Sequence, residues 1–72
     1  MDELAAHLTA AQAHHAALIS IGSDREIRTA YIAALEAEIA LLTDCGGRAD
    51  LAAARDLGFI VDDERAAMAV CQ

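Results

Sequence analysis

Histidine is the residue of this chain best suited to bind a metal ion or to transfer a proton near neutral pH. It occurs at His7, His14 and His15. On a helix, His7 and His14 would lie two turns apart, roughly 10 Å along the axis, and His14 and His15 would point about 100° apart. Two metal ligands on one helix need a spacing of three or four residues. The spacing therefore predicts no metal site, and we expect no cofactor.

The two cysteines are the other candidates for chemistry. Cys45 and Cys71 form no CxxC pair, and we expect both to be reduced thiols. Cys45 lies near a predicted helix C-terminus, where the helix dipole disfavours the thiolate that a nucleophile requires. The sequence also lacks GxSxG, P-loop and GxGxxG motifs. We expect the protein not to be an enzyme.

Length and charge narrow the class of protein. The 72 residues make one small domain, residues 1–72, and 12 acidic residues against 5 basic ones give a net charge of −7. This charge repels nucleic-acid phosphates and anionic lipids, so we expect neither nucleic-acid nor membrane binding. It suits a partner with a basic surface, and it would also serve solubility alone. The opening Met-Asp-Glu lacks the basic segment of a secretory signal, which predicts a cytoplasmic protein.

Composition and capping signals predict an all-α fold. Hydrophobic residues, many of them alanine, make up 57% of the chain, and proline is absent. We expect a helical hairpin of two long helices followed by one or two short helices. The first helix should run from Asp2 to Ile19. Ser23 as N-cap and Glu26 three residues later form a capping box, which begins a second helix that ends at about Asp44.

Apolar residues repeat at heptad spacing in both long helices. The predicted packing or oligomer seam comprises Leu4, Leu8, His15 and Leu18 in the first helix and Ile32, Leu35, Ile39 and Leu42 in the second. His15 is the polar member of this seam, a position that can fix register or oligomeric state, and we expect it to be at least partly buried. A second apolar stripe beside the first predicts that the second helix is central. The short chain and this wide apolar surface predict a homodimer.

Glycines are predicted to end helices in the C-terminal part of the chain. Gly46 and Gly47 are expected to close the second helix in the left-handed conformation. We expect a short third helix near Ala49 to Leu57 that ends at Gly58, followed by Phe59-Ile60-Val61 as a connector. Asp62 is predicted to be the N-cap of a last helix from Asp63 to about Val70.

The segment "DLAAARDLGFIVDDERAAMAV" resembles the helix–turn–helix motif of DNA-binding proteins. The resemblance rests on Leu57-Gly58-Phe59, which match the turn of that motif. The second helix would begin with Asp63-Glu64, which places negative charge where phosphates would lie, and Glu64 falls on the expected apolar anchor. We interpret the segment as a helix–turn–helix shape used for packing.

The stretches "AAQAHHAALISIG" and "RTAYIAALEAEIALL" resemble the two helices of small phage head–tail joining proteins of the lambda W type. The resemblance covers roughly Leu4 to Leu42. That family has a β-hairpin between its helices and a basic tail, whereas only Ser20 to Ser23 separate the helices here. The resemblance implies an alternative function as a phage connector that assembles into a ring, and it assigns no residue roles.

The sequence favours a protein-binding function. We expect a small acidic module that docks on a larger protein as an inhibitor, antiactivator or adaptor. Small acidic proteins of this kind occur among phage and mobile-element regulators of host proteins, such as anti-CRISPR proteins and transcription inhibitors, and would act in the host cytoplasm. The candidate interaction residues are the acidic side chains Glu36, Glu38, Asp62, Asp63 and Glu64.

Overall fold

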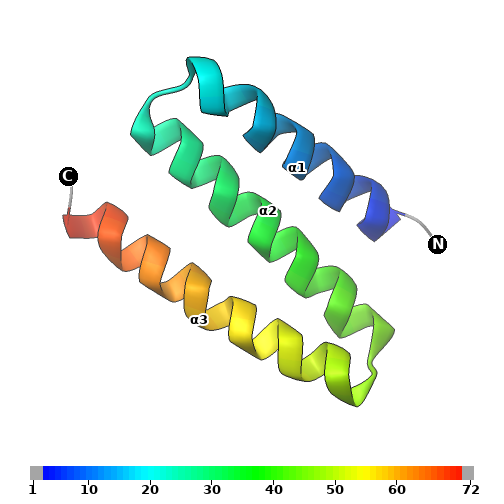
Figure 1. Ribbon diagram of the computed structural model, residues 1–72. Helices are drawn as coiled ribbons and strands as arrows, with labels where there is room; N and C mark the ends of the chain where they lie inside the picture. The colour runs from blue at the N-terminus through cyan, green and yellow to red at the C-terminus, as the bar shows by residue number, and fades with distance from the viewer. Residues whose placement is uncertain (1–2, 71–72) are drawn as a thin grey trace.

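The structure is a computed structural model that describes residues 3–70. It contains three α-helices: α1 (Glu3–Ile21), α2 (Asp24–Cys45) and α3 (Arg48–Val70), shown in Figure 1. Consecutive helices run antiparallel, and the part of the chain that is described has no strand. The predicted all-α class is confirmed. α1 and α2 are both long, and a short turn joins them.

The turn between α1 and α2 has the predicted capping signals. The Ser23 side chain accepts a hydrogen bond from the Glu26 amide at 3.2 Å, and the Glu26 carboxylate accepts one from the Ser23 amide at 2.9 Å. This capping box satisfies N–H groups that the first helical turn leaves free. Gly22 precedes it, and a Cβ there would stand 2.9 Å from the Leu18 carbonyl oxygen. The turn therefore needs glycine for close packing.

The turn between α2 and α3 depends on Gly46. Its φ of 74° is left-handed, and its amide donates to the Leu42 carbonyl at 3.2 Å. Glycine adopts this conformation without the steric cost of a Cβ. The predicted left-handed C-cap is confirmed at Gly46, and Gly47 has no positive φ.

The prediction of two short C-terminal helices is wrong, because α3 is one helix of 23 residues. Gly58 lies inside it, Phe59-Ile60-Val61 continues it, and Asp62 is an interior residue instead of an N-cap. The physical reason is an unbroken series of residues turned toward α2 at spacings of three and four. These residues are Asp50, Ala54, Leu57, Val61, Glu64 and Met68. Packing along this series outweighs a cost of about 1 kcal/mol for one interior glycine.

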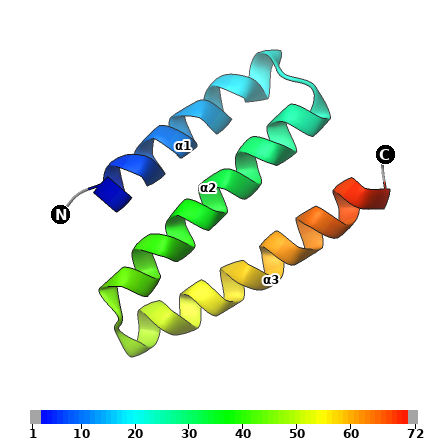
Figure 2. The same ribbon diagram turned by 180° about the vertical axis from the view of Figure 1, so that it is seen from behind.

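The helices form a single layer with α2 in the middle (Figures 1 and 2). α2 packs against α1 along one side and α3 along the other, while α1 and α3 do not approach each other within residues 3–70. The molecule measures 36 × 24 × 13 Å, so its thinnest dimension is about that of one helix, ~10–12 Å. Both flat sides of α2 consequently face outward.

The core is small and lies mainly between α2 and α3. Ile32, Leu35 and Val61 form its buried cluster, with partly buried Tyr31, Ile39, Leu57 and Met68 around it. Where α2 faces α1, the buried residues are alanines: Ala30, Ala34 and Ala37. No residue of α1 is buried. α1 is therefore held by half-buried side chains alone.

Two global measures show how open this arrangement is. The Cα radius of gyration is 12.9 Å, against about 11 Å for a compact chain of this length. The accessible surface is 4937 Å², about 700 Å² more than the ~4,250 Å² expected of a compact monomer of 7.5 kDa. The excess corresponds to surface that a closed bundle would bury.

Candidate interaction faces

The single layer gives the protein two flat faces, which can be identified on α2. Tyr31 and Ala33 are two residues apart on this helix, about 200° around its axis, so they point to opposite sides. We call these sides the Tyr31 face and the Arg65 face. Each is hollowed by shallow depressions between neighbouring helices.

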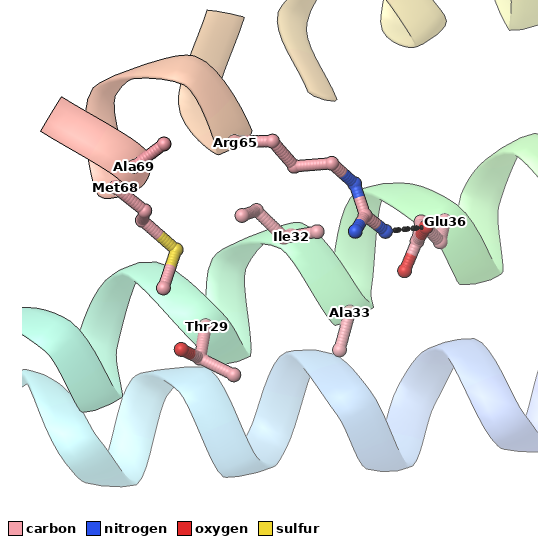
Figure 3. Close-up of a pocket in the computed structure, with 7 residues that line it drawn as sticks. All are labelled: Thr29, Ile32, Ala33, Glu36, Arg65, Met68 and Ala69. Carbon is pink, nitrogen blue, oxygen red and sulfur yellow. Dashed lines mark hydrogen bonds and ion pairs between the residues drawn. The ribbon is translucent and has the colours of Figure 1, made fainter. Parts of the chain in front are cut away.

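The Arg65 face carries two hollows, one on each side of α2. The hollow between α2 and α3 has a volume of about 390 Å³ and is lined by Thr29, Ile32, Ala33, Glu36, Arg65, Met68 and Ala69. Figure 3 shows Arg65 extending from α3 to Glu36 on α2, with Met68 above Thr29. The hollow between α1 and α2 measures about 370 Å³ and is lined by His14, Leu18, Arg25, Glu26, Thr29, Ala30 and Ala33. Thr29 and Ala33 form a low ridge between the two.

A hollow on the Tyr31 face involves all three helices. It measures about 350 Å³ and is lined by His15, Asp24, Ile27, Arg28, Tyr31 and Glu64. The His15 and Tyr31 rings pack with centroids 5.4 Å apart and planes tilted by 34°. Ile19 follows His15 by one turn and Ile60 precedes Glu64 by one turn, and both are exposed. This face therefore combines charged side chains with exposed apolar ones.

Two ion pairs connect α2 and α3, one on each face. The Arg65 guanidinium donates to the Glu36 carboxylate, and Arg28 lies 3.5 Å from the Glu64 carboxylate. Glu64 and Arg65 are adjacent on α3, so the two pairs flank the Ile32–Val61 contact from opposite sides. The pairs fix the register of α3 on α2. Because both pairs are partly exposed to solvent, each contributes at most about 1 kcal/mol to stability.

The structure does not bring the predicted acidic residues together. Glu36 is exposed on the Arg65 face, whereas Glu38 is half-buried and about 200° away around α2. Asp62 and Asp63 are exposed, and Glu64 turns inward to Arg28. Consecutive helical residues point about 100° apart, so Asp62, Asp63 and Glu64 share no common direction.

Seven of the eight residues of the predicted seam lie between the helices of one chain. Leu4, Leu8, His15 and Leu18 are half-buried on the side of α1 that faces α2. Ile32 and Leu35 are buried against α3, with Ile39 partly buried beside them. Leu42 is half-buried on the Tyr31 face.

The histidines do not converge on a common point. His14 lines a hollow of the Arg65 face and His15 lines the hollow of the Tyr31 face. Among residues 3–70, no group of three or more His, Cys, Asp or Glu side chains is placed to hold a metal ion. Cys45 is an exposed free thiol at the end of α2. The predictions on Asp2 and Cys71 lie outside the described residues.

Sequence reasoning missed the basic partners of the acidic residues. Arg28 and Arg65 select which carboxylates are neutralised, and they do so across 36 and 29 positions of the chain. The signal for them was present in α3, where Glu64 belongs to the series that faces α2 and Arg65 follows it directly. It could be used only once α3 was known to be continuous.

Comparisons with known proteins do not place the chain in a family. The chain matches no protein-family model, and no curated protein and no solved structure shows significant similarity to it. Within residues 3–70, no helix combines the length and the apolar character that a bilayer-spanning segment needs.

Proposed function

We propose that this protein is a small acidic protein-binding module that docks on a larger protein through its Arg65 face. It would act as an inhibitor or adaptor, in the manner of phage-encoded or mobile-element-encoded regulators of host proteins in the host cytoplasm. One observation carries this proposal: a single helical layer leaves about 700 Å² more surface exposed than a compact chain of this mass. A specific interface of standard size buries about 800 Å² on each partner, which is of the same magnitude.

The Arg65 face has the shape of a docking surface. Its two hollows lie side by side and share the low ridge of Thr29 and Ala33. A ridge of small side chains lets a partner helix or loop approach α2 closely, while larger partner side chains enter the hollows on either side. Ala33 is exposed at the centre of this surface.

Charge favours a basic partner. The net charge of −7 attracts a positively charged surface and speeds the first encounter with it. Glu36 is bound to Arg65, so Asp62, exposed near this face, is the better candidate for contact with the partner. We expect Asp62→Asn to slow association in low salt and to have little effect in high salt, because salt screens exposed charges. Association rates that do not depend on salt would assign binding to apolar contacts.

Site-specific photo-crosslinking in the source cell tests the proposal. A photo-reactive aromatic amino acid would replace Ala33 in one variant and Ala52, exposed two turns before Phe59 on the outer edge of α3, in the control. We expect the position-33 variant to form an adduct with one larger protein, and the control to form none. The purified chain should then change the activity of that protein. Equal adducts from both positions, or an adduct of position 33 only with a second copy of the chain, would overturn the proposal.

A further inference from the structure

We infer that two copies of this chain pair through their Tyr31 faces, with their α2 helices antiparallel and Arg28 of each copy opposite Glu38 of the other. The inference goes beyond the proposed function, which concerns the Arg65 face and a different protein. A dimer of this kind would be a two-layer bundle with both Arg65 faces outward.

The size of the face fits a stable dimer. The layer measures 36 × 24 Å, roughly 860 Å², and a specific interface of standard size buries about 800 Å² on each partner. One more helical layer would therefore cover the Tyr31 face and leave the Arg65 face open.

The Tyr31 face has apolar side chains placed for such a contact. Tyr31 and Leu42 are half-buried along α2. Ile19 on α1 is 58% exposed and Ile60 on α3 is 40% exposed. These side chains flank α2 on both sides, so a second layer would bury a continuous surface and not an isolated group.

The charges on α2 favour a second copy of the chain as the partner of the Tyr31 face. They also favour an antiparallel arrangement of the two α2 helices. The stripe of α2 that carries Tyr31 has heptad spacing and consists of Asp24, Arg28, Tyr31, Leu35, Glu38 and Leu42. Arg28 and Glu38 are ten residues apart, about 15 Å along the helix, and position 33 lies midway between them. Antiparallel pairing about position 33 therefore places Arg28 opposite Glu38 at both ends. Parallel pairing would oppose like charges.

The Glu38 carboxylate has no ion pair or hydrogen bond within the described residues. Arg28 approaches Glu64 at 3.5 Å and retains N–H groups for a second acceptor. An isologous dimer would satisfy Glu38 twice, once in each copy. The surface is thus complementary to itself in charge.

The register of α3 places Ile60 near the centre of this dimer. Val61 packs with Ile32, and Glu64 pairs with Arg28. Position 33 of α2 is therefore level with about residue 60 of α3. A twofold axis that passes position 33 at right angles to the helices brings Ile60 of one copy close to Ile60 of the other.

Charge-swap complementation tests the pairing on the purified chain, without any other protein. We expect light scattering at micromolar concentration to give twice the 7.5 kDa chain mass for the wild type. Arg28→Glu and Glu38→Arg should each weaken dimerisation by at least about tenfold, because each opposes like charges at two places. An equimolar mixture of the two variants should restore the dimer, because position 28 of each copy then faces an opposite charge at position 38 of the other.

Matched controls separate the interface from folding. Ile60→Glu adds a charge at the predicted axis and should give a monomer. Phe59→Glu, one position away, points to the outer edge of α3, where Phe59 is 61% exposed, and should leave the dimer intact. Far-UV circular dichroism reports whether each variant is folded. A monomeric or larger wild type, a mixture that stays monomeric, or Phe59→Glu as disruptive as Ile60→Glu would each overturn the inference.

Discussion

Truncation of Ile32 to alanine tests whether the cluster between α2 and α3 holds the fold together. Ile32 is 6% exposed and belongs to the buried cluster with Leu35 and Val61. Ile21, at the end of α1, is 82% exposed. The same substitution at these two positions removes the same atoms from opposite environments. The difference between them isolates the contribution of burial.

The magnitude follows from the atoms removed and from what surrounds them. Ile→Ala deletes three carbon atoms, which at about 0.8 kcal/mol each costs ~2.4 kcal/mol in lost burial. A cavity term adds to this, but the flexible Met68 side chain beside Ile32 can fill part of the space. We expect a total of about 3 kcal/mol, within the ~2–5 kcal/mol known for such truncations. Ile21→Ala should change stability by less than about 0.5 kcal/mol.

Urea unfolding followed by circular dichroism at a fixed protein concentration measures both effects. A core of this size rarely contributes more than about 3–5 kcal/mol, so Ile32→Ala is expected to populate the unfolded state without denaturant. Ile32→Val, expected to cost about 0.5–1.5 kcal/mol, keeps the comparison measurable. If Ile32→Ala cost no more than Ile21→Ala, the docking of α3 on α2 through this cluster would be refuted.

Two further expectations concern the helix ends and the glycines. Hydrogen bonds from the Ser23 backbone and side chain lower the pKa of Glu26 below its usual 4.5. A lowered folded pKa gives stability that is present above pH 4.5 and is lost as pH falls through the folded value. The stability difference between wild type and Glu26→Gln should therefore shrink on acidification in thermal melts, and a constant difference would contradict this. Gly58→Ala should stabilise α3 by about 1 kcal/mol, since a Cβ there meets nothing within 4 Å. Gly22→Ala should destabilise, because its Cβ would stand 2.9 Å from the Leu18 carbonyl oxygen. In urea titrations, a destabilised Gly58→Ala would contradict the first statement and an unchanged or stabilised Gly22→Ala the second.

Local signals were sufficient to predict where α2 begins and ends. Ser23 and Glu26 stand at the spacing of a capping box, and Gly46 stands where a helix needs a left-handed residue. These are interactions between residues a few positions apart, so they can be recognised without knowledge of the fold. The two apolar stripes of α2 indicate a central helix for the same reason.

The prediction divided α3 into two helices because it treated Gly58 as a helix end. It did not follow the apolar series that continues through this glycine. Gly58, followed by two β-branched residues and two acids, is typical of a helix end and a new start. The series Ala54, Leu57, Val61 and Met68 nevertheless continues through it. Its burial against α2 is a tertiary effect, and tertiary packing outweighs propensity at a single residue.

The candidate interaction residues depend on register and could not be predicted from composition. Acidic residues that are close in sequence separate on a helix, as Glu36 and Glu38 do. Which carboxylates are free is decided by Arg28 and Arg65, whose partners are on another helix. The helices form a single layer because α1 and α3 do not contact each other within residues 3–70. The sequence pattern of one helix does not indicate which other helices it contacts.

The melting temperature as a function of protein concentration tests most directly whether the open layer is completed by a second copy. Association stabilises a folded state by mass action, so the melting temperature of a dimer rises with protein concentration. We predict such a rise for the wild type over about a hundredfold range of concentration, and a lower, constant melting temperature for Ile60→Glu. A wild-type melting temperature that is independent of concentration and equal to that of Ile60→Glu would show that the layer is stable alone.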